Sequence, residues 1–491
     1  MTLLQPYASP LDDIWISLDL ETTGLSTDKD EIIEIGAVKF QGDVTIDTFH
    51  TLVNPHKTLS NFIKRYTGIS QEEVDTAPPF SRMARELVQF IGSAPIIGHN
   101  IAFDLGFLAS KGLKLSNPRC DTWDMAFVLL PQNREYALAK ISASLGISHH
   151  RPHRALEDAQ VTMALFLKLT KMATELDVYT LAEMERLASR SSWVLSYILK
   201  GLEGHKTTTL SSHQPLSEQD PQVGITGLDV HSIRERHRHA RTLKPNQKLQ
   251  KIEVDRVATL LGKSGPLTSA VPKFEERTEQ MSMARAVANA INEEKHLMVE
   301  AGTGVGKSLA YLLPAALYAL ENNKRVVVST NTINLQEQLL TKDIPALVKV
   351  LETEEPKRVG EFRYTQLKGR ANYLCLTRWS HLRSSDNLTD DEARLLSKVM
   401  VWLKSSTDGD RSELNLANRN AAAPWDKMSA QGAQDCTGFN GACFLRAARD
   451  RAAAAHLVVV NHALLMADLV SSRALIPDYD VLIIDEAHHL E

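Results

Sequence analysis

The sequence predicts an α/β protein with at least two folded units. Short runs rich in valine and isoleucine alternate with segments of helical spacing, and a glycine-rich loop stands between an apolar run and a helix-prone segment. A polar stretch without periodic apolar positions separates the two halves. The 491 residues correspond to about three domains at roughly 150 residues each. With 43% hydrophobic residues, the composition excludes a chain that is disordered throughout.

The first unit is expected at residues 12–175. Residues 14–20 and 31–40 are predicted strands because turn-forming residues separate two apolar runs. Residues 96–97 form a further short apolar strand, and residues 155–169 place apolar side chains at helical spacing.

A helical extension and a polar linker are expected at residues 176–250. The helix is predicted at residues 176–202, and residues 204–221 have the Ser, Thr, Gln, Gly and Pro content of a linker. A basic run follows, which only Glu235 opposes: Arg234, Arg236, Arg238, Arg241, Lys244, Lys248 and Lys251. This run is either the solvated face of a linker or a stripe that contacts phosphates.

The second unit is expected at residues 251–491. Residues 296–300, 325–329 and 481–484 are predicted strands, the last an unbroken apolar run typical of a buried parallel sheet. Residues 349–456 are polar, helix-prone and too long for a simple connection, which indicates an inserted helical subdomain.

Acidic residues in three separate motifs are candidate metal ligands. Asp19 and Glu21 lie two apart on a predicted strand and therefore share a face. Asp104 ends the motif His-Asn-Ile-Ala-Phe-Asp, and Asp158 follows His153 in His-Arg-Ala-Leu-Glu-Asp-Ala. Neighbouring carboxylates repel each other unless a cation lies between them, and Mg²⁺ prefers oxygen ligands.

These motifs, together with Asp-Leu-Glu-Thr-Thr-Gly at residues 19–24, make residues 12–172 resemble the DEDD exonucleases of the DnaQ type. The resemblance implies a ribonuclease-H-like mixed sheet and 3′→5′ cleavage of DNA. It also implies that Asp19, Glu21, Asp104 and Asp158 hold two Mg²⁺ or Mn²⁺ ions, with His153 as the general base. The alternative is a domain of this fold that has lost catalysis.

A phosphate-binding loop is predicted in the second unit. It comprises Ala301, Gly302, Thr303, Gly304, Val305, Gly306, Lys307 and Ser308. In such a loop backbone N–H groups surround phosphate oxygens, Lys307 reaches the phosphates and Ser308 ligates Mg²⁺. Asp485, after a buried strand, is expected to hold the same Mg²⁺, and Glu486 to orient the attacking water. The alternative is a flexible glycine loop without a ligand.

The Asp-Glu-Ala-His motif at 485–488 and residues 276–280, 329–332, 368–375 and 458–465 resemble superfamily 2 helicases of the DinG branch, relatives of the XPD helicases. The resemblance implies a RecA-like domain in which Gln280 reads adenine and residues 329–332 contact DNA. An exonuclease placed ahead of such a helicase is a known arrangement. Because Glu491 follows His488 by three residues, we expect the second RecA-like domain to be absent and ATP hydrolysis to be weak.

Relatives in this branch often carry a [4Fe–4S] cluster on four cysteines. The candidates here are Cys375, Cys436 and Cys443, while Cys120 falls in the exonuclease. A four-thiolate cluster lacks one ligand, so the alternative is an insert packed by other means.

Composition limits the functional classes. A net charge of −5 requires any nucleic-acid contact to be local, and four cysteines indicate a reducing compartment. No signal peptide or membrane span is recognisable, which favours a cytoplasmic protein without a membrane partner.

The leading hypothesis is a metal-dependent 3′→5′ exonuclease joined to the ATP-binding half of a helicase. It would act on single strands or 3′ ends in DNA repair or replication, with replication or repair proteins as possible partners. The alternatives are a DNA-tethering module and a polymerase-associated proofreading subunit.

Overall fold

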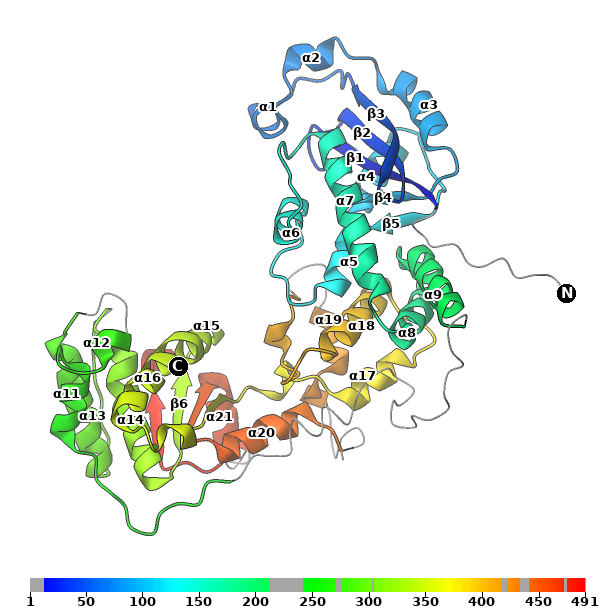
Figure 1. Ribbon diagram of the computed structural model, residues 1–491. Coiled ribbons are helices and arrows are strands. Elements are labelled where there is room, and N and C mark those ends of the chain that lie inside the picture. Colours follow the sequence, from blue (N-terminus) through cyan, green and yellow to red (C-terminus); the bar gives the residue numbers. More distant parts are fainter. Residues whose placement is uncertain are drawn as a thin grey trace. The chain divides into compact units, whose positions relative to one another are not determined.

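The computed structural model describes residues 13–211, 242–270, 275–302, 304–416, 422–432, 441–471 and 475–490. The chain divides into two compact units, both of which contain sheets and helices (Figure 1). The first unit contains residues 1–231 and 377–428, and the second contains residues 232–376 and 429–491. The predicted α/β class is confirmed.

The first unit is built on a five-stranded mixed sheet in the order β3-β2-β1-β4-β5. Its strands are β1 (Ile14–Thr22), β2 (Ile32–Gln41), β3 (Val44–Leu52), β4 (Ile96–Gly98) and β5 (Arg119–Asp121). Strand β2 runs antiparallel to β1 and β3, whereas β1, β4 and β5 are mutually parallel. This is the mixed sheet that the exonuclease resemblance implies.

Within the described residues 13–211, the first unit contains nine helices. They are α1 (Asn61–Thr67), α2 (Gln71–Asp75), α3 (Phe80–Ile91), α4 (Ile101–Ser110), α5 (Thr122–Leu129), α6 (Leu138–Ser144), α7 (Ala155–Thr174), α8 (Val178–Ser189) and α9 (Ser196–Ser211). Helix α7 packs on β1 and β2 (Figure 1). Glycine is required at Gly36 of β2, because a Cβ there would lie 2.2 Å from the carbonyl carbon of Ala155. The start of α7 is therefore pressed against the sheet.

The predicted extension differs from the structure in two places. Residues 176–202 form two helices, α8 and α9, instead of one. The linker predicted at residues 204–221 is wrong in its first part, because α9 continues to Ser211. No proline interrupts that part. Of the basic run, Lys244, Lys248 and Lys251 are exposed, and the four arginines lie outside the described residues.

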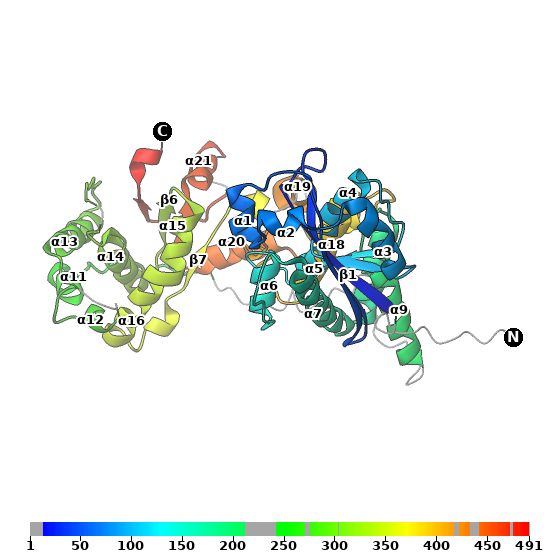
Figure 2. The ribbon, with the colours of Figure 1, turned by 90° about the horizontal axis from the view of Figure 1, so that it is seen from above.

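Part of the predicted insert belongs to the first unit. It contains the helices α17 (Leu376–Arg383), α18 (Asp390–Leu403) and α19 (Ala422–Met428). Each of these helices carries one tryptophan that exposes no surface: Trp379, Trp402 and Trp425. Helix α18 packs against α5 and α8 (Figure 1), and Figure 2 shows α18 beside α5.

The second unit contains a parallel sheet in the order β7-β8-β6-β9. Its strands are β6 (Val326–Thr330), β7 (Tyr364–Gln366), β8 (Leu457–Asn461) and β9 (Val481–Ile484). Its helices include α11 (Val254–Leu261), α12 (Leu267–Ala270), α13 (Thr278–Asn292), α14 (Lys307–Asn322), α15 (Ile333–Gln338), α16 (Ile344–Glu354), α20 (Phe444–Ala454) and α21 (His462–Val470).

The strand predicted at residues 296–300 is wrong. This segment pairs with no strand of the described chain, and it exposes Leu297, Met298 and Val299. An apolar run becomes a strand only when a neighbour satisfies its backbone hydrogen bonds.

None of the helices in the described part of the chain is long and apolar enough to cross a lipid bilayer.

Candidate functional site

Strand β1 carries the first two candidate ligands, Asp19 and Glu21. Both lie on one face because side chains alternate along a strand. Their partners across the antiparallel pair are Gly36, opposite Asp19, and Glu34, opposite Glu21. Glycine at position 36 leaves room for the start of α7, so the sheet and α7 meet beside these carboxylates.

The other two carboxylates come from the first turns of two helices. Asp104, in α4, accepts a hydrogen bond of 3.0 Å from the backbone N–H of Leu20, between Asp19 and Glu21. Asp158, in α7, accepts one of 3.3 Å from the N–H of His153. The positive end of each helix dipole favours an acid at this position. The structure thus brings the residues of all three sequence motifs to one place.

The pKa values of all four carboxyl groups are raised. Burial, reinforced by Asp158, Glu34 and Asp104, raises the pKa of Glu21 to about 8. Burial also raises the pKa of Asp104 to about 8, and it raises those of Asp19 and Asp158 above their usual values. Four carboxyl groups that resist ionisation together form a site that a divalent cation would stabilise, and oxygen is the ligand that Mg²⁺ and Mn²⁺ prefer.

His153 lies at the edge of the carboxylate cluster. Ligand atoms of His153, Glu21 and Asp158 all fall within 4.8 Å of one another. The His153 backbone is left-handed, with φ of 71°, and its ring stacks on Tyr66 with centroids 3.7 Å apart. Phe62 stacks on Tyr66 in turn at 5.3 Å. Burial lowers the pKa of His153, so the imidazole is neutral near pH 7.

Sequence reasoning missed two residues of this site. The Nε2 of His149 lies 2.6 Å from Asp158 Oδ1, and its ring is almost fully buried. Glu34 is buried beneath Glu21, where it accepts hydrogen bonds from Arg154 and the N–H of Ala155. Glu34 belongs to a predicted strand but to no motif, and His149 belongs to neither.

The phosphate loop of the second unit has the backbone that an anion site requires. Gly304 and Gly306 have φ of 85° and 82°, and Gly306 caps the N-terminus of α14. Lys307 begins that helix and its Nζ lies 3.3 Å from Glu486 Oε1, while Thr303 lies outside the described residues. Gln280 Nε2 donates to the Gly306 carbonyl at 2.8 Å. The residues predicted around a nucleotide phosphate are thus side by side.

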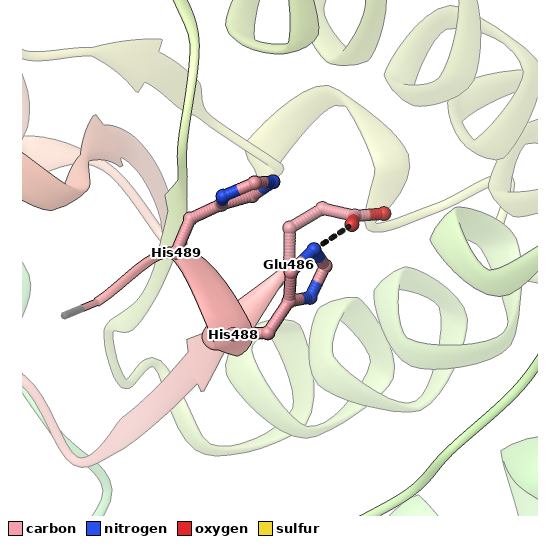
Figure 3. Close-up of side chains that lie close together, drawn as sticks. All are labelled: Glu486, His488 and His489. Atoms are coloured by element: carbon pink, nitrogen blue, oxygen red, sulfur yellow. Dashed lines mark ion pairs between the residues drawn. The ribbon is translucent and has the colours of Figure 1, made fainter.

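The acids of the Asp-Glu-Ala-His motif follow β9. Asp485 Oδ2 accepts a hydrogen bond of 3.1 Å from Tyr311 on α14. Glu486 also faces His488 at 3.5 Å, and His489 lies beside them (Figure 3). Glu486 pairs with Lys307, and both histidines are exposed. Glu486, His488 and His489 therefore lie at the predicted nucleotide site.

The described cysteines belong to different parts of the fold. Cys375 is buried next to α17, and Cys443 caps α20, its sulfur 3.5 Å from the N–H of Arg446. Cys436 lies outside the described residues. Cys120 is buried in β5, as a small core residue would be.

Comparison with known proteins identifies both halves. Residues 16–166 match the exonuclease family, and residues 281–357 match the DEAD/DEAH box helicase family. The chain thus contains one stretch that matches an exonuclease model and a later stretch that matches a DEAD/DEAH box helicase model. Both predicted resemblances are confirmed.

Two curated relatives align with most of the chain. The 3′-5′ exonuclease DinG of Bacillus subtilis (strain 168) is 32% identical, with an alignment that covers 97% of this chain and 50% of the relative. The protein of that name from Staphylococcus epidermidis is 29% identical, over 81% of this chain and 42% of the relative. This exonuclease–helicase chain spans about half the length of the curated relatives that it matches.

Solved structures match the exonuclease domain. Exonuclease X in complex with 5′ overhanging duplex DNA is 21% identical and covers 33% of this chain and 94% of its own, with a TM-score of 0.28. The nuclease domain of 3′hExo, a DEDDh family member bound to rAMP, is also 21% identical. It covers 35% and 98% of the two chains, with a TM-score of 0.31.

Proposed function

We propose that the exonuclease domain removes nucleotides from the 3′ end of DNA strands with the help of divalent metal ions. The observation that carries this proposal is the cluster of four carboxyl groups whose pKa values are raised by burial, with repulsion from the other carboxylates adding to the shifts of Asp19 and Glu21. Such a cluster is costly to the fold unless it binds cations, and His153 lies next to it.

Each residue then has a defined role. Asp19, Glu21, Asp104 and Asp158 would hold Mg²⁺ or Mn²⁺. Such ions supply a Lewis acid that lowers the pKa of water and stabilises charge on a departing oxygen. His153, neutral near pH 7, can accept the proton of the attacking water on an imidazole nitrogen. Tyr66 keeps the His153 ring in place by stacking.

For the helicase domain we propose binding of ATP with Mg²⁺. The N-terminus of α14 and Lys307 would contact the phosphates, Ser308 and Asp485 would ligate Mg²⁺, and Glu486 would orient water. Gln280 would recognise the adenine base while its amide nitrogen remains hydrogen-bonded to the Gly306 carbonyl. The biological setting that fits both activities is DNA repair or replication.

The test uses the purified chain and single strands labelled at either end, with and without Mg²⁺ and ATP. A 5′ label should report progressive shortening that needs the metal. Asp19→Ala should abolish this activity, while Lys307→Ala should abolish ATP binding and leave cleavage intact. Full cleavage by Asp19→Ala would overturn the proposal.

We also propose that the predicted insert, residues 349–456, is packed by apolar side chains and not by a four-thiolate cluster. Three fully buried tryptophans, Trp379, Trp402 and Trp425, support this proposal. The purified protein should then contain little or no iron. Stoichiometric iron and sulfide would contradict it.

A further inference from the structure

A segment from the helicase half of the sequence packs on the exonuclease domain. Residues 377–428 are flanked on both sides by helicase residues, yet they cluster with the exonuclease unit. Within that unit α18 lies along α5 and α8 (Figure 1). The contact therefore joins parts of one compact body that are far apart in the sequence.

Two basic side chains of α18 lie in this contact, the partly buried Arg394 and the fully buried Lys398, whose pKa burial lowers to about 7. Arg394 pairs with Asp124 of α5 at 2.8 Å, and the same carboxylate accepts a hydrogen bond of 3.0 Å from Trp193 Nε1. Lys398 exposes no surface. Its Nζ lies 3.0 Å from the Tyr136 hydroxyl and 3.6 Å from the centre of the Phe127 ring.

Buried cations are tolerated only with well-placed partners, because desolvation of the charge is otherwise costly. Lys398 has a further partner in the backbone oxygen of Asn415, at 2.9 Å. The contact is therefore geometrically specific, and α18 fixes the position of Tyr136 and of α5.

Tyr136 and the start of α5 form hydrogen bonds with His99 and Asn100, which precede helix α4 and Asp104. His99 Nε2 lies 2.8 Å from the Tyr136 carbonyl oxygen. Since a carbonyl only accepts, Nε2 carries the hydrogen. His99 Nδ1 lies 3.0 Å from the Thr122 hydroxyl, which also donates to the Gly98 carbonyl. The N–H of Asn100 donates to Asp121, the N-cap of α5, at 2.9 Å. His99 and Asn100 lead directly into α4, whose first turn carries Asp104.

The insert leaves and rejoins the helicase domain at one point. Leu374 and Ser429 form an antiparallel bridge, and the N–H of Ala430 donates to the Tyr373 carbonyl at 2.8 Å. The two ends that flank residues 377–428 therefore lie side by side within the second unit.

We propose that α18 is a positioning element of the exonuclease, in which Lys398 and Arg394 hold Tyr136 and α5 and thereby keep residues 99–104 in place for Asp104 to bind metal. Lys398 and Arg394 are positioning residues, since neither touches the carboxylate cluster. This inference rests on the proposed nuclease function, and it means that a segment of the helicase half completes the nuclease site.

The test compares Lys398→Met with Lys404→Ala in the full chain. Lys404 is a matched control, because it follows α18 and pairs with Asp177 at 2.5 Å but is partly exposed and does not contact Tyr136 or α5. Three quantities are measured: hydrogen exchange of the residue 99–104 amides in metal-free protein, Mn²⁺ affinity by calorimetry, and single-turnover cleavage of a labelled single strand.

For Lys398→Met we expect faster exchange at residues 99–104 and Mn²⁺ binding weakened about 10- to 100-fold. Turnover should fall by up to about 100-fold, with KM for the strand unchanged. Lys404→Ala should match the wild type in all three. Unchanged exchange and Mn²⁺ affinity in folded Lys398→Met protein would overturn the inference.

If Lys398→Met fails to fold, Tyr136→Phe decides. It removes the hydroxyl that lies beside Lys398 and that also donates to the Leu130 carbonyl, and we expect shifts in the same direction but smaller. No change in exchange or Mn²⁺ affinity would overturn the inference. A wild-type chain without nuclease activity would refute the proposed function instead, while the exchange comparison would still judge the positioning role.

Discussion

Two histidines approach Asp158, and their geometry gives them different tasks. His153 lies among the carboxylates with its ring stacked on Tyr66, whereas His149 is buried and hydrogen-bonded to Asp158 Oδ1. A hydrogen bond to a ligating carboxylate orients that ligand, while an imidazole at the edge of the cluster can exchange a proton with water.

His153→Ala should therefore lower turnover by about 10²- to 10⁴-fold with Mn²⁺ affinity almost unchanged. His149→Ala is the matched comparison, and it should weaken Mn²⁺ binding about 10- to 100-fold. Single-turnover kinetics and calorimetry on the two variants measure both quantities. Weaker Mn²⁺ binding in His153→Ala, with slow turnover and unchanged Mn²⁺ affinity in His149→Ala, would instead make His149 the base and His153 the residue that orients Asp158.

Glu34 gives the exonuclease domain a pH-dependent source of stability. Burial opposes its ionisation, but hydrogen bonds from His50, Arg154 and the N–H of Ala155 prevail and hold its pKa at about 2. Because this value lies below the usual 4.5, the stabilisation is complete above pH 4.5 and is lost as the pH falls toward 2. The difference between the two values corresponds to roughly 3 kcal/mol.

Glu34→Gln should accordingly reduce the free energy of unfolding by about that amount at pH 6 and by less at pH 3. Denaturant titrations at the two pH values measure this. Glu86→Gln removes an exposed carboxylate and should change the unfolding free energy by less than about 1 kcal/mol at either pH. An equal loss for Glu34→Gln at both pH values would contradict the assignment.

At the scale of elements, helix α1 contributes an aromatic cover to the site. Phe62 and Tyr66 lie one turn apart on α1 and stack in sequence on His153. Partial burial of the imidazole lowers its pKa, and the Tyr66 ring, parallel to the imidazole, forms part of that cover.

Tyr66→Ala should expose His153 and raise its pKa toward the usual value of 6.5. The acidic limb of the pH–rate profile should then move to higher pH, because more of the base is protonated near neutrality. NMR titration of His153 in metal-free protein measures the pKa. Phe62→Ala is the control, because Phe62 stacks on Tyr66 and Tyr66 is the ring that stacks on His153; this variant should change the His153 pKa less. A His153 pKa that Tyr66→Ala leaves unchanged would show that Tyr66 does not cover the imidazole.

The elements also show how far the sequence predicts the structure. Strands β1 and β2 were predicted because turn-forming residues separate two apolar runs, and helix α7 because its apolar residues have helical spacing. Strand β3 was missed because it is mostly exposed along its length. Residues 296–300 were wrongly predicted because an apolar pattern does not reveal whether a partner strand exists.

The candidate site was predicted by residue type and motif, and its supports were not. His149 and Glu34 act through contacts with residues in other elements, and neither belongs to a motif. The association of α18 with the exonuclease was beyond sequence reasoning for the same reason. Lys398 and Tyr136 are 262 positions apart, and no local pattern encodes such a pairing.

At the scale of the whole molecule, the insert makes the two halves of the sequence interdependent. The exonuclease unit takes three helices from within the helicase sequence, and Asp124, Tyr136 and Phe127 are buried partly by α18. A chain without these helices would expose an aromatic cluster and leave Asp124 without its arginine.

Replacing residues 377–428 by a short glycine linker tests this interdependence. The bridge between Leu374 and Ser429 places the two ends side by side, so the linker should not disturb the helicase domain. We expect the melting transition of the exonuclease unit to fall by several degrees or to disappear, because the cluster loses both apolar cover and ion pairs. ATP binding should be preserved, since Lys307, Asp485 and Glu486 lie in the other unit. Calorimetry and nucleotide titration on the same sample measure both, and an exonuclease transition at the wild-type temperature would show that the insert is only a neighbour.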